Sequence, residues 1–442
     1  MKTSDDQAVR KIRQAIAIIG AGPAGLYTAI ALAKKNIPSL LIDKAVYPRD
    51  KVCGEALTSN VLRYIHRLAP DILLSNEFVK AKHIVKGLRF HSPNGKQLYL
   101  HFQSGANISK GLDSFIGMRR LHLDNILMEY ARTFPLITIL EGEYVKNIER
   151  TDSGITLYNG SGSLEIQTEM VVVSNGYASK LAQYLTNKSW GEEADACGIT
   201  AFYRNVAGIS DGDQAECFIL PELKSGGLYV LPVGNGIVNV NIALRNDIRK
   251  KYGINLRHVL ANTLKTHPVL KERFANAEEF RKPLGHGYHM GLKKRNISGD
   301  RFLLIGDAGG FNDPISANGI AHAMISADIA VESIAHAYMT KDYSAQMFRQ
   351  YKKKVYKAFW KIRVTGMITS PIMSHPKVLF FIVNNFFRLN CGQELLSRVM
   401  YAKHPWKLLF NPEFYYAMIR SSLERKNEKN KSLVSLKETR IL

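Results

Sequence analysis

The 442-residue sequence predicts an α/β fold (α+β overall), in which a βαβ domain is interleaved with an antiparallel-sheet domain and followed by a helical C-terminal region. Three observations predict it. A strand–glycine turn–helix–strand pattern occupies residues 15–44, short strands fill residues 198–244, and amphipathic helical stretches follow residue 340. With 46% apolar and 22% charged residues, the chain has a globular composition and is long enough for one large or two ordinary domains.

The opening stretch has the pattern of a dinucleotide-binding βαβ unit. A buried parallel strand at 15–19 runs into the glycine turn GAGPAG, and a helix at 26–35 leads to a second strand that ends in Asp43. These elements lie within the span of about 30 residues that such a unit requires. The stretch therefore predicts dinucleotide binding, although it does not distinguish FAD from a nicotinamide.

Each glycine of the turn has its own physical purpose. Gly20 allows the tight turn out of the strand, and Gly25 lets the helix pack closely on the sheet. Gly22 has no Cβ, so a pyrophosphate can approach the backbone N–H groups at the positive end of the helix. Asp43 lies where its carboxylate can accept hydrogen bonds from a ribose hydroxyl.

The loop at 45–60 follows this unit directly and can fold over a bound dinucleotide. Arg49 and Lys51 are suited either to neutralise phosphate charge or to serve as ordinary solvated loop residues. Cys53 is either a small buried residue or a group beside the cofactor.

The middle of the chain alternates between strand and helix patterns. Residues 84–103 predict strands about a turn at 92–95, and a helix follows residues 117–120. Further strands are expected at 137–140, 144–149, 154–158, 164–167 and 170–174. The strands at 198–244, with a hairpin turn at Gly234–Gly236, indicate a second, antiparallel sheet, and residues 254–280 return to helix.

A second informative stretch covers residues 301–328. A buried strand ends at Gly306-Asp307, two further glycines break the chain, and an Ala-rich helix begins near Ala317. A strand that leads to a helix N-terminus favours an anion. Asp307 would repel a phosphate and is better suited to accept hydrogen bonds from polyol hydroxyls.

The cysteine pattern and the N-terminus give expectations about location. The four cysteines are scattered with no CxxC spacing, so we expect neither a disulfide framework nor a metal site. The polar N-terminus runs straight into the first strand and predicts no secretory signal. We therefore expect a reducing, cytoplasmic compartment.

The net charge of +22 suggests an acidic partner, either nucleic acid or an anionic membrane surface. The charge is dispersed and no nucleic-acid-binding signature is present, so nucleic acid is disfavoured. After residue 340 the chain is aromatic and basic; these aromatics form either core or a surface at the inner face of a membrane. No apolar run is long enough to span a membrane, and the tail from Arg425 predicts disorder.

Three separated segments together resemble a known family. They are GAGPAG with Asp43, PRDKVCGEAL at 48–57 and GDAGGFNDPISANGI at 306–320. In this order and spacing the chain, from about residue 15 to 340, resembles the FAD-dependent oxidoreductases of the p-hydroxybenzoate hydroxylase fold, and within them the geranylgeranyl reductase-like branch.

The resemblance implies a set of site residues. It implies that the following residues contact FAD: Gly20, Gly22, Pro23, Ala24, Gly25, Asp43, Lys44, Arg49, Cys53, Gly54, Arg120, Asp307, Gly319 and Ile320. Arg120, with Arg119 a close second, resembles the family's cofactor-contacting arginine, and Asp307 would bind the ribityl chain. Asn318 to Ile320 would present backbone N–H groups to the flavin N1–C2=O edge, where a helix N-terminus stabilises negative charge.

No catalytic acid, base or metal site stands out, and hydride chemistry requires none. The candidates for the wall of the substrate pocket are Cys53, Tyr229, Pro314 and His322. His286, His289 and His322 are possible proton donors, but a single histidine is more often structural.

The domain assignment follows the same reasoning. The FAD-binding domain is expected at 1–80, 105–180 and 285–340, the antiparallel-sheet substrate domain at 81–104 and 181–284, and the helical C-terminal region with a flexible basic tail at 341–442.

The function that the resemblance implies is hydride transfer from reduced flavin to a C=C bond of an apolar substrate, such as a polyprenyl lipid, with NAD(P)H as electron donor. The alternative is a flavin-dependent monooxygenase or halogenase acting on an aromatic or polyene substrate. The segment at 227–232 has no tryptophan where the reductase branch often has one, and Ser174-Asn175-Gly176 stands where the family often has Asp-Gly. A flavin-binding nucleic-acid modifier is a third and less favoured class.

Overall fold

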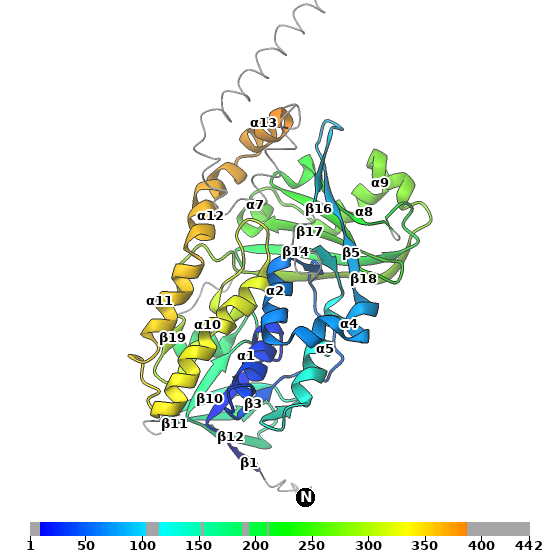
Figure 1. The fold of residues 1–442 in the computed structure, drawn as a ribbon. Helices are drawn as coiled ribbons and strands as arrows, with labels where there is room; N and C mark the ends of the chain where they lie inside the picture. The colour runs from blue at the N-terminus through cyan, green and yellow to red at the C-terminus, as the bar shows by residue number, and fades with distance from the viewer. Residues whose placement is uncertain (1–8, 103–114, 152–153, 188–193, 210–211, 387–442) are drawn as a thin grey trace, which may run out of the picture.

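The structure, a computed structural model, describes residues 9–102, 115–151, 154–187, 194–209 and 212–386 (Figure 1). Two large sheets dominate it, one at the centre of the βαβ domain and one in the part of the molecule drawn at the upper right. The predicted mixed α/β fold with a helical C-terminal region is confirmed.

The first large sheet has six strands in the order β19-β20-β13-β2-β3-β9. Their bounds are β2 Ile16–Ile19, β3 Ser39–Ile42, β9 Ile137–Leu140, β13 Met170–Val173, β19 Ser298–Gly299 and β20 Phe302–Leu304. All neighbours except β19 and β20 are parallel, so the carboxyl ends of β20, β13, β2 and β3 meet at one edge. In open parallel sheets this edge is where ligands bind.

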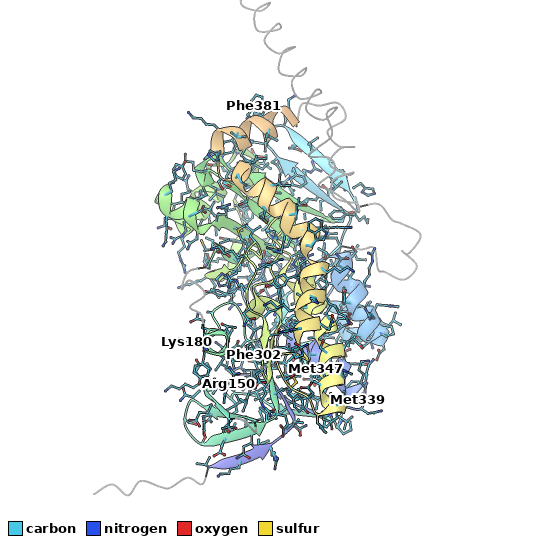
Figure 2. All side chains as sticks on the ribbon, turned by 90° about the vertical axis from the view of Figure 1, so that its left-hand side faces the viewer. Arg150, Lys180, Phe302, Met339, Met347 and Phe381 are labelled. Carbon is cyan, nitrogen blue, oxygen red and sulfur yellow. The ribbon has the colours of Figure 1, made fainter. Side chains whose placement is uncertain are left out.

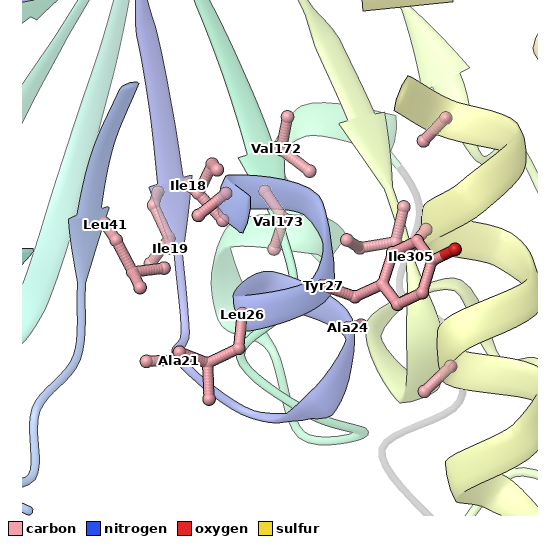
Figure 3. Packing of buried hydrophobic residues seen from close by; sticks show 14 of the residues in the cluster. Ile18, Ile19, Ala21, Ala24, Leu26, Tyr27, Leu41, Val172, Val173 and Ile305 are labelled. Atoms are coloured by element: carbon pink, nitrogen blue, oxygen red, sulfur yellow. The ribbon is translucent and has the colours of Figure 1, made fainter. Parts of the chain in front are cut away.

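Helices cover this sheet and bury its apolar strands. Helix α1 (Pro23–Ala33) packs against α10 (Gly319–Thr340) and α5 (Arg120–Arg132). Figure 3 shows Leu26 and Tyr27 of α1 within the core that the strands supply. Because α1 is enclosed on nearly all sides, its sequence is apolar all round rather than amphipathic.

The second large sheet has seven strands in the order β18-β14-β17-β16-β15-β6-β7, antiparallel except for the pair β15 and β6. Their bounds are β6 Gly87–His91, β7 Gln97–His101, β14 Ala196–Arg204, β15 Gln214–Ile219, β16 Gly226–Pro232, β17 Ile237–Arg245 and β18 Glu278–Tyr288. The predicted hairpin about Gly234–Gly236 is confirmed as the β16–β17 connection.

Helices α7 (Asn246–Lys251), α8 (Leu256–Thr266) and α9 (Pro268–Arg273) lie in the chain between β17 and β18. Helix was predicted to continue to residue 280, but β18 begins at Glu278. This strand runs to Tyr288, four residues beyond the expected domain boundary. It was not recognised in the sequence because its charged residues, Pro283 and two glycines are unusual in a central strand, although an edge strand tolerates them.

Two small sheets complete the strand content. One is ordered β1-β12-β11-β10, with β1 Arg10–Arg13, β10 Val145–Thr151, β11 Gly154–Asn159 and β12 Leu164–Thr168; the other is ordered β4-β8-β5, with β4 Ala56–Leu57, β5 His83–Val85 and β8 Phe115–Gly117. Strand β1 was not predicted, because its residues RKIR are mostly polar and exposed, as suits an edge strand.

The remaining helices are α2 Ser59–Leu68, α3 Pro70–Leu74, α4 Asn76–Ala81, α6 Lys180–Thr186, α11 Arg349–Ala358, α12 Trp360–Met373 and α13 Pro376–Phe386. Helices α11 to α13 run along one side of the molecule, from the βαβ domain toward the seven-stranded sheet (Figure 1). Residues 387–442, which include the last part of the predicted helical region and the tail from Arg425, lie outside the described residues.

Among the described residues, no single helix is both long and apolar enough to cross a membrane. The segments Trp360–Ile372 and Pro376–Asn384 meet the requirement of length and composition only as a pair, which is bent by 104° at the break between them.

Candidate active site

The glycine turn lies at the ligand-binding edge of the six-stranded sheet. Gly20 has a φ of +104°, and a Cβ there would lie 2.7 Å from the carbonyl of Ser174. A Cβ on Gly25 would lie 1.9 Å from the carbonyl oxygen of Gly20. These two glycines are therefore required for close packing of the turn, as predicted from the sequence.

Gly22, the N-cap residue of α1, has a different environment. The nearest atom to a Cβ built there is Nη2 of Arg49, at 4.0 Å. The N-terminus of α1, which begins with Pro23 and Ala24, is thus open on this side. The guanidinium of Arg49 lies beside it. This arrangement suits a pyrophosphate.

Asp43 anchors the turn through its carboxylate. One oxygen accepts from the backbone N–H of Ala21 at 2.6 Å and the other from that of Ala45 at 2.8 Å. Each carboxylate oxygen has a further lone pair, so hydrogen bonds from a ribose remain available. Lys44, the next residue, is exposed.

A buried cluster of charges orients Arg49. Asp124 accepts two hydrogen bonds from Arg120, each at 2.6 Å, and one from Nη1 of Arg49 at 2.7 Å. Burial disfavours the charge of Arg120, but the ion pair with Asp124 outweighs this and raises the pKa of Arg120. Two donor groups of Arg120 are thereby committed to Asp124, so Arg49 is the arginine placed beside Gly22.

A second cluster ties the loop 45–60 to the seven-stranded sheet. Asp50 accepts hydrogen bonds from Arg119, at 2.6 Å, and from Arg281 of β18. The guanidinium of Arg119 also lies over the rings of Phe202 and Phe280, 5.1 and 5.3 Å from their centroids. Arg119 therefore links the loop to the seven-stranded sheet, and its contact with a cofactor stays a prediction.

Cys53 and Gly54 lie on the same loop. The carbonyl of Cys53 accepts from Nδ2 of Asn239 at 3.2 Å and from Oγ1 of Thr200 at 3.4 Å. Gly54 is exposed, and a Cβ there would meet nothing within 4 Å. Burial and the neighbouring Glu55 raise the pKa of the Cys53 thiol, which favours its protonated form.

Glu55 was not predicted as a site residue, although it lies within the PRDKVCGEAL segment. Its side chain is fully buried, one oxygen accepts from the backbone N–H of Arg120, and the other has no partner among the described residues. Burial raises the pKa of Glu55 well above its ordinary value, which favours the neutral form of the carboxyl group.

Lys51 interacts electrostatically with both Arg49 and Asp307 in the candidate cofactor site. Lys51 is set deep in the molecule yet partly accessible, and its ammonium forms no ion pair with any residue that the structure describes. Burial lowers the pKa of Lys51, and Asp307 opposes this shift. An unpaired cation near Arg49 and a carboxylate beyond it match the phosphates and the polyol chain of FAD, so these residues fit the group.

Helix α10 begins beside Asp307 with Asn318 as its N-cap. The Asn318 side chain accepts from the N–H of Ala321 at 3.4 Å and donates to Oγ1 of Thr58 at 2.9 Å. The N–H of Gly319 donates to the carbonyl of Ala317 at 2.8 Å, so that predicted donor is engaged in this structure. The contact of Ile320 with a flavin remains a prediction.

Tyr229 faces the loop of Cys53. It lies opposite Asn241, which lies opposite Thr200, and directly paired residues of antiparallel strands point to the same face. With 43% of its surface accessible, Tyr229 is one of the more exposed aromatic side chains of the described residues. The nearby Cys217 and burial raise its pKa well above the ordinary value of tyrosine, and its phenol stays protonated.

Pro314 lies beside α12, and His322 lies beside Phe359, the residue that precedes this helix. A Cβ on Gly366 of α12 would lie 2.5 Å from Cγ of Pro314, which shows how closely the helix packs there. Nδ1 of His322 donates to the carbonyl of Phe311 at 2.8 Å, and the ring lies 4.5 Å from that of Phe359. Burial lowers the pKa of His322, so it is held as a neutral ring.

The polar face of the seven-stranded sheet was also missed. Asn239 and Asn241 alternate with Val238 and Val240 along β17, which is the signal that a sequence can carry for a strand with one polar face. Of the histidines, His286 shares this face, while His289 is buried with Nδ1 3.5 Å from Asp195.

Known proteins resemble this chain in sequence. A sequence model of the FAD binding domain matches residues 13–363. Digeranylgeranylglycerophospholipid reductase of Thermoplasma acidophilum is 24% identical over 348 residues, covering 78% of this chain and 83% of that protein. The same-named reductase of Methanosarcina acetivorans is 26% identical, over 78% of this chain and 80% of that protein.

Another relative has a different name. The 1H-pyrrole-2-carbonyl-[peptidyl-carrier protein] chlorinase of Pseudomonas fluorescens is 24% identical over 76% of this chain and 79% of its own length.

Solved structures share the fold. A geranylgeranyl bacteriochlorophyll reductase-like protein from Thermoplasma acidophilum superposes with a TM-score of 0.71 at 20% identity, covering 97% of this chain and all of that one. Halogenase PltM gives 0.67 at 17% identity over 92% and 85% of the two chains, and a variant of it was solved with FAD.

Proposed function

Because the chain belongs to the family of proteins that share this FAD binding domain, we propose that it reduces a C=C bond of an apolar, lipid-like substrate by hydride transfer. As a member of this family it is an FAD-dependent oxidoreductase of the geranylgeranyl reductase-like type. The substrate class and the electron donor, for which we propose NAD(P)H, are the parts that need testing.

The observation that carries the lipid proposal is the position of α12. This helix packs on Pro314, and its exposed surface includes Trp360 and Met367, of which 53% and 57% are accessible. Helix α13 continues the apolar surface with Phe381, which lies at the outer end of the molecule (Figure 2). The helix that packs on the predicted pocket wall thus also carries exposed apolar side chains, which supports an apolar substrate.

The chain's own residues would hold the cofactor and complete the reduction. FAD, when bound, supplies the hydride chemistry. Arg49 and Lys51 would bind its phosphates, and Asp307 would accept from its polyol hydroxyls. When one carbon of the C=C bond receives a hydride, the other takes a proton, and the protonated Tyr229 phenol and Cys53 thiol are the candidate donors.

We propose that the protein acts in the cytoplasm, at an anionic membrane surface. The net charge of +22 and the exposed apolar side chains of α12 and α13 support this, because basic and apolar groups together favour an anionic interface. The three cysteines within the described part of the chain are unpaired, which is compatible with a reducing compartment.

Identification of the product by mass spectrometry tests the proposed function. The holoprotein, a reductant and a polyprenyl phospholipid should give a product that is heavier by two hydrogens for each bond reduced. A variant carrying Tyr229→Phe should slow this conversion by about a hundredfold if the phenol is the proton donor. A product that gains oxygen or a halogen instead would refute the reductase assignment.

The similarity to a chlorinase and to halogenases supports one second candidate, an oxygen-dependent halogenase or monooxygenase. On that alternative, substrate would accelerate oxygen consumption, and no product would form without oxygen.

A further inference from the structure

A pocket lies on the side of the seven-stranded sheet where β14 and β18 pair. Its volume is about 760 Å³, and its walls are formed by β14, β18 and the segment that carries α7 and the start of α8. This volume falls within the range of about 300–1,000 Å³ that is usual for small-molecule sites.

Basic side chains line this pocket. Arg249, Lys250 and Arg257 line it, and no Asp or Glu is among the lining residues that the structure describes. Asp247, close in sequence, is paired with Arg245 at 2.6 Å. Arg249 and Arg257 therefore place positive charge on the pocket wall, and neither forms an ion pair with a residue in the described part of the chain.

Arg249 is held in place by neutral groups. Its Nε donates to Oδ1 of Asn246 at 2.8 Å, and Nδ2 of the same asparagine donates to the carbonyl of Ala194 at 3.3 Å. Arg257 forms no ion pair within the described part of the chain. A cation oriented by an amide keeps its full charge for a ligand, and a guanidinium suits phosphate.

Glycines keep the pocket open toward the interior. A Cβ on Gly285 would meet nothing closer than the carbonyl oxygen of Gly198, at 3.9 Å. At Gly287, by contrast, a Cβ would lie 2.8 Å from Ala194 and 3.1 Å from the Tyr177 ring. The pocket wall is thus tightly packed at Gly287. At Gly285, which has no side chain, a ligand can approach the backbone closely.

His286 lies between these two glycines and links the pocket to the candidate active site. Its ring packs edge-to-face on Tyr177, with centroids 5.1 Å apart. Burial and the nearby Lys51 lower the pKa of His286 to about 4, and Asp307 and Arg120 also act on it. The same side chain therefore lines this pocket and lies close to the groups expected to hold FAD.

From this geometry we propose that the pocket binds the phosphate group of an anionic small molecule, whose remaining part extends toward His286. Two molecules would carry that chemistry: a phosphorylated nicotinamide nucleotide and the headgroup of a phospholipid. The connection to the flavin rests on the proposed function, whereas phosphate binding itself does not depend on turnover.

Isothermal titration calorimetry of the oxidised holoprotein tests the proposal. NADP+ and glycerol phosphate are the two probes, with nicotinamide riboside and glycerol as their phosphate-free counterparts. Because FAD occupies its own site in this protein, its phosphate-binding residues are not available to the probes. We expect at least one phosphate probe to bind, its counterpart not to bind, and the affinity to fall as salt rises.

Two variants locate the site. Arg249→Ala and Arg257→Ala should each weaken binding of that probe by about tenfold or more, since each removes a charge-assisted contact. Lys282→Ala is the matched control, because this exposed lysine of β18 carries the same charge and does not line the pocket. Gly285→Leu should abolish binding by filling the space without removing a charge; FAD content and thermal unfolding verify that each variant is folded.

The result identifies the source of the phosphate as well. Binding of NADP+ alone indicates a nucleotide, and binding of glycerol phosphate alone indicates a lipid headgroup. The proposal is overturned if neither probe binds, if the arginine variants bind as the unmodified protein does, or if Lys282→Ala weakens binding equally. Loss of hydride transfer with phosphate binding intact would count against the proposed function and not against this pocket.

Discussion

At the scale of single residues, Asp124 is the centre of the candidate cofactor site. It is fully buried and accepts hydrogen bonds from both Arg120 and Arg49. Removal of its charge leaves two buried or half-buried guanidinium groups without a partner and frees Arg49 to move away from Gly22.

We therefore predict that Asp124→Asn lowers the free energy of unfolding by about 3–5 kcal/mol, the usual cost of breaking a buried ion pair from one side. FAD affinity should fall by at least tenfold. Glu129→Gln is the control, because Glu129 pairs with Arg132 on the exposed side of the same helix and such pairs contribute less than about 1 kcal/mol. Thermal unfolding and FAD titration measure both effects; equal stability of the two variants would contradict the assignment.

Glu55 gives a prediction about pH. Its pKa is raised in the folded protein, so the folded state binds a proton that the unfolded state releases above a pH of about 4.3. Stability attributable to this group is complete below that pH and is lost as the pH rises toward the raised pKa. Glu55→Gln keeps an acceptor for the Arg120 N–H and cannot ionise, so its stability relative to the unmodified protein should increase from pH 5 to pH 8. Urea unfolding at the two pH values measures this; a constant difference would show that Glu55 does not stay neutral.

The sequence identified some of these residues and not others for a physical reason. Gly20, Asp43 and Asp307 belong to local patterns of strand, turn and helix, which spacing alone reveals. The pairing of Asp50 with Arg281, separated by 231 positions, depends on how two sheets meet and leaves no local pattern. Glu55 was missed because nothing in its neighbours distinguishes a buried glutamate from a solvated one.

At the scale of elements, the glycine turn separates two roles that look alike in the sequence. A Cβ at Gly25 meets the carbonyl of Gly20, whereas one at Gly22 meets only the flexible end of Arg49. Gly25 should matter for folding and Gly22 for the ligand.

We predict that Gly25→Ala lowers the free energy of unfolding by about 3 kcal/mol, at the upper end of the range for an overpacked interior. Gly22→Ala should leave stability within about 1 kcal/mol of the unmodified protein and weaken FAD binding by about tenfold, because its methyl group lies where a pyrophosphate would approach. Each variant is the other's control in denaturant unfolding and flavin titration. An unstable Gly22→Ala protein would indicate that this side of the turn is closed.

The same scale explains which elements the sequence predicts. The buried strands β2, β3, β13 and β20 are continuous apolar runs, and helices begin directly after β2 and soon after β13 and β20, so their existence follows from periodicity. The edge strands β1 and β18 carry charges, proline or glycine, because one side of an edge strand needs no partner. Their pairing is decided by the neighbouring strand rather than by their own residues.

At the scale of the whole molecule, the apolar surface of α12 and α13 lies far from the C-terminal end of α10, which carries Met339. Figure 2 shows Phe381 at one end of the molecule and Met339 at the opposite end. Both side chains are exposed, at 50% and 78%. They therefore form a matched pair for testing which end meets a membrane.

We predict that Phe381→Glu lowers co-sedimentation with anionic vesicles by several-fold, since it places a negative charge in the apolar surface that we propose faces anionic lipid. Met339→Glu introduces the same charge at the far end and should leave binding unchanged. If the two variants lose binding equally, net charge and not α13 determines the interaction. If the unmodified protein does not bind anionic vesicles at low salt, the membrane proposal is wrong.

The central claim, that this FAD-dependent oxidoreductase is a reductase and not an oxygen-using enzyme, is tested most directly by a single turnover without oxygen. The holoprotein is reduced anaerobically and mixed with a polyprenyl phospholipid, and reoxidation of the flavin is followed by its absorbance. We predict that the lipid reoxidises the flavin with one C=C bond reduced for each flavin. A flavin that stays reduced with the lipid and reoxidises in a substrate-coupled way only when oxygen is admitted would contradict the account.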